Sequence, residues 1–200
     1  MQEAIHHLRI SDPVLAAIIE QVGAYRIEFR EPGFETLAKA IVFQQLSGRV
    51  ANVIFARLVK AAGEPLTAEG VLKLRPSRMR TLGLSKQKIT YIRDLARKTR
   101  DGDVNFTALH GMSDQAVIEA LTSIKGIGVW TVHMFLIFAL RRPNVLPVGD
   151  LGIRAAIRKA YGMADLPTPG EIVEMARPWH PWCTVASWYL WRSLEPNANL

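Results

Sequence analysis

The sequence predicts an all-α protein. Apolar residues recur at helical spacing along most of its 200 residues, and the alternating pattern of a β-strand is nearly absent. Helix-capping residues stand before many of these periodic segments. Only Arg26 to Arg30 has an extended pattern. We therefore expect about ten short helices joined by short loops.

The first half of the chain has a start signal before most of its expected helices. Asp12 precedes Pro13, and proline is tolerated in a first turn because the N–H that it lacks would have no partner there. Ser47-Gly48 divides one apolar segment into two helices. Thr67 and Ser85 are suitable N-caps for the next two. The expected segments are 11–22, 34–47, 49–62, a short helix from 67, and 85–99.

The second half follows the same rule. Ser113-Asp114 begins one helix, and residues 168–171 have the pattern of a capping box with proline at the first helical position. The segment 129–140 is almost wholly apolar, so we expect a central, buried helix there. The expected segments are 113–123, 129–140, 149–161, a helix from 168, and 182–194.

The composition excludes several classes of protein. Hydrophobic residues make up 49% and charged residues 22%, which excludes a disordered chain, a collagen and a coiled coil. The single cysteine, Cys183, excludes an internal disulfide, a cysteine-based zinc site and a cysteine-ligated iron–sulfur cluster. The longest apolar run, Met134 to Leu140, is too short for a membrane span, and the N-terminus has no signal-peptide core. We expect a cytoplasmic protein with no membrane partner.

Positive charge is concentrated in one stretch. The net charge is +7 and the isoelectric point is about 9.9. Between Lys73 and Arg100 there are ten basic residues and one acid, Asp94, so this stretch carries +9 and the rest of the chain is slightly negative. Such clustering indicates a polyanionic partner. A solvated helix face is the alternative interpretation.

A glycine-rich turn stands between two of the expected helices. Residues 121–131 join them through Gly126-Ile127-Gly128. The glycines permit a tight turn, and the uncovered backbone N–H groups at the start of the following helix favour a phosphate. Ile127 can fill the core and fix the turn. A tight turn without a ligand is the alternative.

A second pattern follows 22 residues after Gly128, where the loop 146–150 ends in Gly149-Asp150 at a helix start. A hairpin, an apolar helix and a Gly-Asp loop in this order and spacing resemble the helix-hairpin-helix DNA glycosylase superfamily. The closest resemblance is to its 3-methyladenine DNA glycosylase II group, the alkylation-repair branch. It extends from about Phe34 to Trp191.

The resemblance assigns roles to individual residues. It implies that Asp150 is the catalytic aspartate, whereas the local sequence alone favours a simple N-cap. Bifunctional members have a lysine where this sequence has Trp130, so the resemblance implies a monofunctional enzyme that forms no Schiff base. Trp130 and Trp191 correspond to walls of the base pocket. Met134 stands where the family has a tyrosine, and Gln45 lies next to the pocket.

DNA contacts are implied in the same way. Leu46 corresponds to the side chain that wedges into the minor groove, with an ordinary core leucine as the alternative. A lysine precedes the hairpin glycines where the family usually has proline. The expected phosphate-binding residues are Lys125, Gly126, Gly128, Thr131, Lys86 and Lys88. The expected backbone-carbonyl ligands of a monovalent cation, Na⁺ or K⁺, are Thr122, Ile124 and Ile127.

The implied protein is a single glycosylase unit of two helical lobes, about 34–147 and about 1–33 with 148–200, with a DNA-binding cleft between them. It excises 3-methyladenine or 7-methylguanine from double-stranded DNA by base flipping and hydrolysis of the N-glycosidic bond, which initiates base excision repair. No cofactor is required, and the resemblance implies only a structural Na⁺ or K⁺ at the hairpin when DNA is bound. The partner is a duplex with a damaged base, and we expect a nucleoid-associated monomer. Too few residues precede Phe34 for the N-terminal β-rich lobe of larger relatives.

Two other functions fit parts of the sequence. A non-catalytic helix-hairpin-helix module would dock DNA in a repair complex, although docking requires neither Asp150 nor the tryptophan-rich tail. A glycosylase for deaminated or mismatched bases would share the motifs, because lesion choice depends on how the pocket side chains pack. The lesion range, including ethenoadenine and hypoxanthine, therefore stays open.

Overall fold

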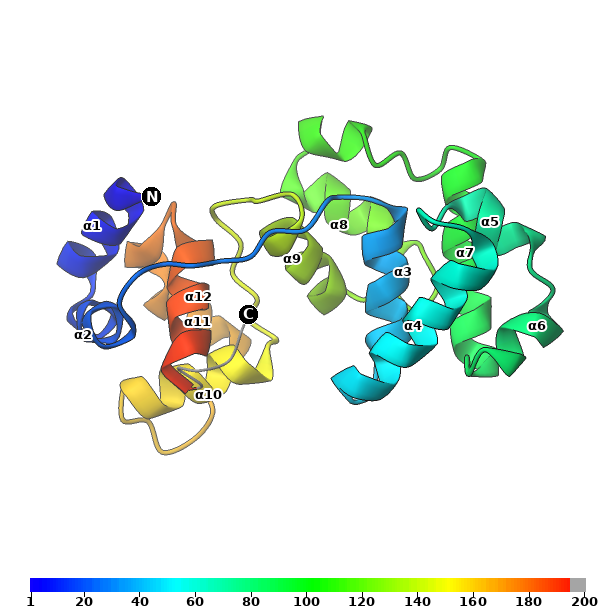
Figure 1. Ribbon diagram of the computed structural model, residues 1–200. Coiled ribbons are helices and arrows are strands. Elements are labelled where there is room, and N and C mark those ends of the chain that lie inside the picture. The colour runs from blue at the N-terminus through cyan, green and yellow to red at the C-terminus, as the bar shows by residue number, and fades with distance from the viewer. Residues whose placement is uncertain (195–200) are drawn as a thin grey trace. The chain divides into compact units, whose positions relative to one another are not determined.

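The computed structural model describes residues 1–194, and all regular secondary structure in that range is helical, which confirms the predicted fold class. No β-strand occurs among these residues (Figure 1). The α-helices in chain order are α1 (Gln2–Ser11), α2 (Pro13–Val22), α3 (Phe34–Phe43), α4 (Gly48–Ala62), α5 (Ala68–Lys73), α6 (Pro76–Thr81), α7 (Lys86–Arg100), α8 (Asp114–Thr122), α9 (Val129–Phe138), α10 (Leu151–Ala160), α11 (Pro169–Met175) and α12 (Cys183–Leu194). Two short 3₁₀ helices, η1 (Ala108–Gly111) and η2 (Arg177–Trp179), lie between them.

Side-chain caps begin the helices where the sequence predicts them. Asp12 Oδ1 accepts the N–H groups of Val14 and Leu15 at 2.9 and 3.1 Å, at the start of α2. Thr168 and Glu171 form the reciprocal capping box of α11. Side-chain cap bonds are also made by the other predicted caps, which are Thr67, Ser85, Ser113 and Asp150. Each bond joins residues two or three positions apart, which is why local sequence predicts it.

The structure differs from the prediction at five places. Helices α1 and α6 were not predicted. Helix α1 buries only Ala4 and Leu8, and α6 is just six residues long. Residues 26–30 are not a strand. Helix α3 ends at Phe43 and not near residue 47, because a turn follows it, and α9 ends two residues before the predicted position. Weak or short hydrophobic patterns account for the added helices.

The chain divides into two compact units. The central unit is Arg30–Phe135, and the terminal unit is residues 1–29 together with the chain from residue 136 onward. The expected second boundary near 147 differs from this one because the loop after α9 belongs to the terminal unit. Thr184 on α12 accepts the Val145 N–H at 3.0 Å and donates to the Arg142 carbonyl at 2.6 Å.

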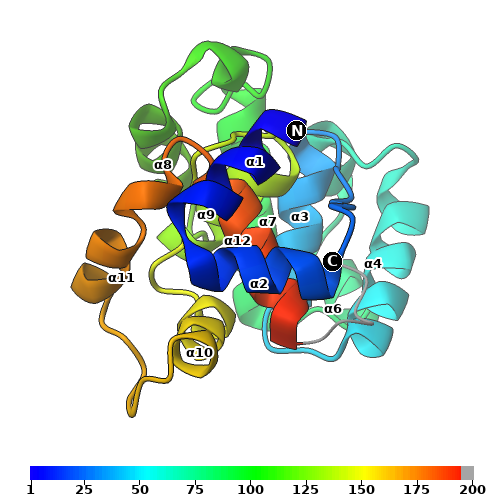
Figure 2. The same cartoon turned by 90° about the vertical axis from the view of Figure 1, so that its left-hand side faces the viewer.

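Helix α12 is the centre of the terminal unit. Its residues from Cys183 to Leu190 are all buried, and α1, α2 and α10 pack against it. Figure 2 shows α2 lying across α12. Asp12 joins this packing through Oδ2, which accepts hydrogen bonds from Trp179 Nε1 at 2.7 Å and from the Tyr161 hydroxyl. A buried carboxylate therefore ties α2 to η2 and to the end of α10.

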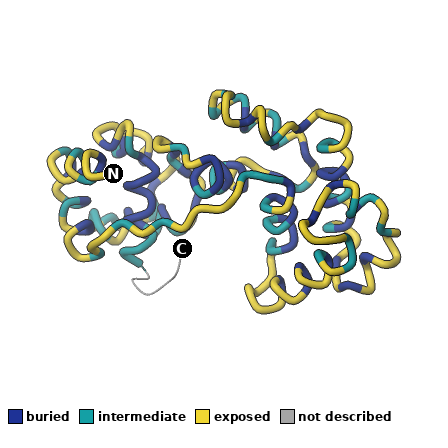
Figure 3. Tube along the Cα trace, turned by 45° about the horizontal axis from the view of Figure 1, so that its top comes forward, coloured by how far each residue is buried: buried dark blue, intermediate teal, exposed yellow. Residues whose placement is uncertain are grey.

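Helix α7 has the same place in the central unit, where α3, α5 and α6 pack against it. Its buried apolar residues Ile89, Ile92, Leu95 and Ala96 recur at helical spacing. Buried and exposed positions alternate in this way along both units (Figure 3). Within residues 1–194, no helix is both long and apolar enough to cross a membrane.

Candidate active site

Asp150 is fixed at the start of α10. Its side chain caps the helix, because Oδ1 accepts the Ile153 N–H at 2.8 Å. The same oxygen accepts a hydrogen bond from the indole Nε1 of Trp191 on α12, also at 2.8 Å. The residue is only 8% exposed. Two N–H donors, one local and one distant in sequence, therefore hold the carboxylate in a single orientation.

Trp191 lies in the same cluster in the terminal unit. Its ring stacks on Phe138, with centroids 6.0 Å apart and an interplanar angle of 24°. A Cβ on Gly152 would lie 3.0 Å from both Asp150 Oδ1 and Trp191 Cδ1, so glycine leaves the room that this hydrogen bond needs. Sequence reasoning assigned Trp191 to a pocket wall but missed its hydrogen bond to Asp150 and the contribution of Gly152.

The hairpin between α8 and α9 has one glycine that the backbone requires. Gly126 has φ of 82°, and a Cβ there would overlap the ring of Tyr91. Gly128 has an ordinary φ and open space around the position of a Cβ, so the turn itself does not require it. That result corrects the expectation that both glycines serve the turn. Ile127 is buried, as predicted.

A carboxylate on α7 accepts a hydrogen bond from the hairpin backbone. Asp94 Oδ2 accepts the backbone N–H of Lys125 at 2.9 Å, and Asp94 itself is buried. The predicted phosphate contact at Lys125 is thereby restricted to its exposed side chain, because the backbone N–H already has a partner. Sequence reasoning missed the role of Asp94. The available signal was that Asp94 is the one acidic residue between Lys73 and Arg100.

The first turn of α9 presents Trp130, which is 53% exposed. Met134 lies one helical turn later and is partly buried. Thr131 is buried, so its side chain is poorly placed for the phosphate contact that we expected. Burial of the neighbouring His133 lowers its pKa.

The loop after α3 carries the predicted wedge. Leu46 is 38% exposed, so it is not an ordinary core leucine. Gln45 has φ of 55°, in the left-handed region that non-glycine residues seldom adopt. Gln44 Nε2 donates a hydrogen bond to the Gly126 carbonyl at 2.8 Å. The structure therefore brings the wedge loop and the hairpin together within the central unit.

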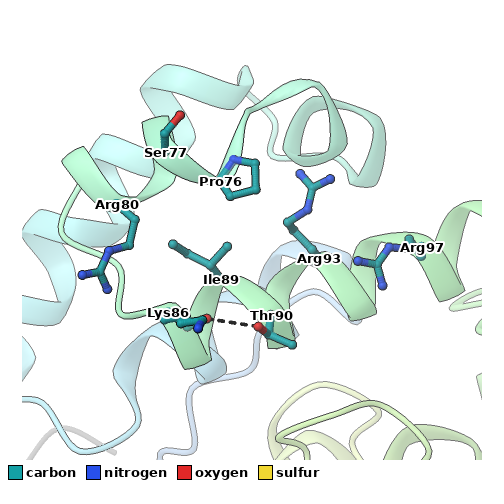
Figure 4. Close-up of a pocket in the computed structure, with 8 residues that line it drawn as sticks. All are labelled: Pro76, Ser77, Arg80, Lys86, Ile89, Thr90, Arg93 and Arg97. Carbon is teal, nitrogen blue, oxygen red and sulfur yellow. Dashed lines mark hydrogen bonds between the residues drawn. The ribbon is translucent and has the colours of Figure 1, made fainter.

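The two predicted lysines of α7 have different surroundings. Lys88 Nζ donates to the Val42 carbonyl at 2.7 Å, and desolvation lowers the pKa of this lysine. Its principal contact is thus with the end of α3. Lys86 is exposed and lines a hollow of about 530 Å³ formed by α6 and α7. Figure 4 shows Arg80, Arg93 and Arg97 around the same hollow.

The hairpin carbonyls suit a cation in their chemistry. Thr122 ends α8, where carbonyls have no partner within the helix and the helix dipole is negative. The Ile124 carbonyl accepts the Ile127 N–H at 3.1 Å and keeps a second lone pair. In residues 1–194, no group of three or more His, Cys, Asp or Glu side chains is arranged to bind a metal ion.

The chain is similar to known DNA glycosylases. DNA-3-methyladenine glycosylase 1 of Schizosaccharomyces pombe is 35% identical over 94% of this chain and 85% of its own length. The solved S. pombe 3-methyladenine DNA glycosylase in complex with abasic DNA has a TM-score of 0.82 at 34% identity, covering 95% of each chain. A DNA-3-methyladenine glycosidase structure from Bacillus halodurans has a TM-score of 0.89 at 34% identity, covering 96% of this chain and 89% of that one.

Residues 38–181 match the profile of the HhH-GPD superfamily base excision DNA repair protein. The matched range includes the wedge loop, the hairpin and Asp150. The chain therefore belongs to the HhH-GPD superfamily of base excision DNA repair proteins.

Proposed function

We propose that this protein is a monofunctional DNA glycosylase that excises alkylated purines, chiefly 3-methyladenine and 7-methylguanine, from double-stranded DNA. The observation that carries the proposal is the Asp150 carboxylate, which two N–H donors hold at the start of α10. The relatives named as 3-methyladenine glycosylases support the alkylated substrate. A module that only docks DNA would need neither the carboxylate nor its indole partner.

The reaction begins when the damaged nucleotide rotates out of the duplex, because its glycosidic bond is inaccessible in the stack. The bond between C1′ and the base nitrogen breaks, and its electron pair leaves with the base. A cationic alkylpurine is neutralised by that pair and leaves readily. The Asp150 carboxylate stabilises the positive charge that develops on the sugar. Water then adds to C1′ and loses a proton, which yields the free base and an abasic site.

Trp130 is the proposed stacking partner of the extruded base. It is well exposed at the start of α9. A cationic purine over an indole face gains about 0.5–2 kcal/mol from cation–π attraction, which a neutral, undamaged purine does not. Met134, one turn away, offers a polarisable thioether in place of the phenol that the family has there.

Trp130 also determines the type of reaction. An indole nitrogen is not a nucleophile, so no Schiff base forms with the sugar at this position. Hydrolysis therefore leaves the DNA backbone intact. Incubated DNA should break only after hot alkali, and borohydride should trap no covalent complex. A trapped adduct that disappears in Lys125→Ala would instead show a bifunctional enzyme.

The hairpin and the basic hollow are the proposed DNA-backbone contacts. At Gly128 nothing obstructs a close approach to the start of α9, where backbone N–H groups and the helix dipole favour a phosphate. Lys86 and its arginine neighbours add charge without sequence preference. The hairpin carbonyls of Thr122, Ile124 and Ile127 would hold Na⁺ or K⁺, which would supply positive charge close to the same phosphate.

Single-turnover excision by Asp150→Asn tests the proposal. Asparagine keeps an oxygen that can cap α10 and accept from Trp191, but it carries no negative charge. We expect DNA affinity to be retained and excision of 7-methylguanine to fall by about 10²- to 10³-fold. The same change at exposed Asp103 is the control and should leave the rate unaltered. Near-wild-type turnover by Asp150→Asn would overturn the assignment.

A further inference from the structure

The turn that carries the wedge has a backbone that needs external support. The Leu46 N–H donates to the Phe43 carbonyl at 3.3 Å, which closes a four-residue turn. Gln44 (φ −53°, ψ 127°) and Gln45 (φ 55°) have the backbone signs of a type II β-turn. That turn prefers glycine at the position of Gln45, so a glutamine there is strained. Strain of this kind persists only where neighbouring contacts hold it.

Three side-chain bonds to backbone connect the end of α3, the hairpin and α7 in a closed ring. Lys88 on α7 donates to the Val42 carbonyl at 2.7 Å. Asp94, also on α7, accepts the Lys125 N–H at 2.9 Å. Gln44 donates to the Gly126 carbonyl at 2.8 Å and completes the ring. Of the three side chains, only that of Gln44 belongs to the turn itself.

We propose that Gln44 is a positioning residue that fixes the wedge turn to the phosphate-binding hairpin. The proposal rests on the function proposed above. The Gln44 bond fixes the distance between the tip of the turn and a phosphate held by the hairpin. The tip then meets the base stack in a defined register while the damaged base leaves it. Without the bond, the strained turn relaxes and the wedge enters the stack less often.

A comparison of two substrates separates positioning from a general structural role. In one duplex a 7-methylguanine is paired with cytosine, and in the other it lies opposite an abasic-site analogue, where no base pair has to break. A wedge matters more for the paired lesion. The readout is a ratio: the single-turnover excision rate on the paired lesion divided by the rate on the unpaired lesion. Loss of folded enzyme lowers both rates equally and leaves this ratio unchanged.

Gln44→Met keeps the length of the side chain and removes its donor. We expect the paired lesion to be excised about five- to tenfold more slowly, the value of one hydrogen bond, and the unpaired lesion less than about twofold more slowly. Affinity for undamaged duplex should change less than about twofold, because the hairpin contacts remain. Gln115→Met is the matched control, since it removes an exposed bond to Glu119 on α8 and should leave the ratio at the wild-type value.

A second variant restores the donor. Gln44→Lys can still donate to the Gly126 carbonyl and should return the ratio to near the wild-type value. If Gln44→Met does not fold, Gln44→Glu replaces it, because a carboxylate cannot donate, and its ratio should fall below that of Gln44→Lys. Equal losses on both duplexes, or a Gln44→Lys ratio as low as that of the non-donating variant, would overturn the proposal. Failure of the wild-type protein to excise either lesion would instead refute the proposed function.

Discussion

Asp12 and Asp150 are two aspartates in nearly the same local surroundings. Each caps a helix, each is more than nine-tenths buried, and each accepts a hydrogen bond from a tryptophan indole, Trp179 or Trp191. Asp12 also accepts a hydrogen bond from the Tyr161 hydroxyl, which ties it into the core of the terminal unit. A capped, indole-bonded carboxylate is therefore not by itself a catalytic group. The proposed catalytic role of Asp150 rests in addition on its distance along the chain from the hairpin.

The largest expected contrast is between the two Asp→Asn variants. Asp12→Asn turns an amide N–H towards the donors of Trp179 or Tyr161, and should lower the free energy of unfolding by about 2–3 kcal/mol. Its excision rate per folded molecule should match that of the wild type, whereas Asp150→Asn loses excision with a smaller change in stability. Chemical denaturation and single-turnover kinetics measure both. Loss of excision in folded Asp12→Asn would remove the distinction.

Variants of the two indole partners, Trp191 and Trp179, should show the same contrast between excision and stability. Trp191→Phe keeps an aromatic ring next to Phe138 and removes the bond to Asp150, so we expect excision to slow by about tenfold, as for loss of a bond to a charged group. A pH–rate profile altered in Trp191→Phe would identify an effect on the carboxylate. Trp179→Phe is the counterpart and should reduce the melting temperature without altering that profile. An unchanged rate in Trp191→Phe would mean that the bond from Trp191 is not needed to orient Asp150.

Glycine substitutions sharpen the comparison further. Ala at Gly152 places a Cβ 3.0 Å from both Asp150 Oδ1 and Trp191 Cδ1, and neither atom belongs to a freely moving chain end. We expect the Asp150–Trp191 bond to lengthen and excision to slow by a few-fold, with unfolding affected by about 1 kcal/mol. Gly33→Ala, where nothing lies near the Cβ, is the control. Equal excision rates for Gly152→Ala and Gly33→Ala would show that Asp150 and Trp191 accommodate the added methyl group without loss of activity.

The smallest expected effect concerns His133. Burial lowers its pKa in the folded state below the unfolded value of about 6.5. The folded state therefore binds this proton less readily, so stability is full above pH 6.5 and declines as the pH falls from there towards the folded pKa. His133→Gln should flatten that decline in denaturation curves between about pH 7 and 5. His110→Gln, at an exposed histidine, provides the comparison. A slope unchanged in His133→Gln would contradict the burial effect.

Local sequence determined much of this protein. Helix starts, the capping box, the buried Ile127 and the spacing from the hairpin to Asp150 all depend on residues close in the chain, and the structure has each of them. The family resemblance rested on the same short patterns. Helix α1 escaped prediction because its ten residues bury only two side chains, so their periodicity is weak.

Tertiary structure alone decided which atoms meet across the chain. The bonds from Asp94 to the hairpin, from Gln44 to Gly126 and from Trp191 to Asp150 join residues 31, 82 and 41 positions apart. It also placed Lys88 against the end of α3 and buried Thr131, where the sequence suggested phosphate contacts. A cap is specified by residues within one helical turn, whereas these contacts depend on how separate helices pack, and no short segment contains that information.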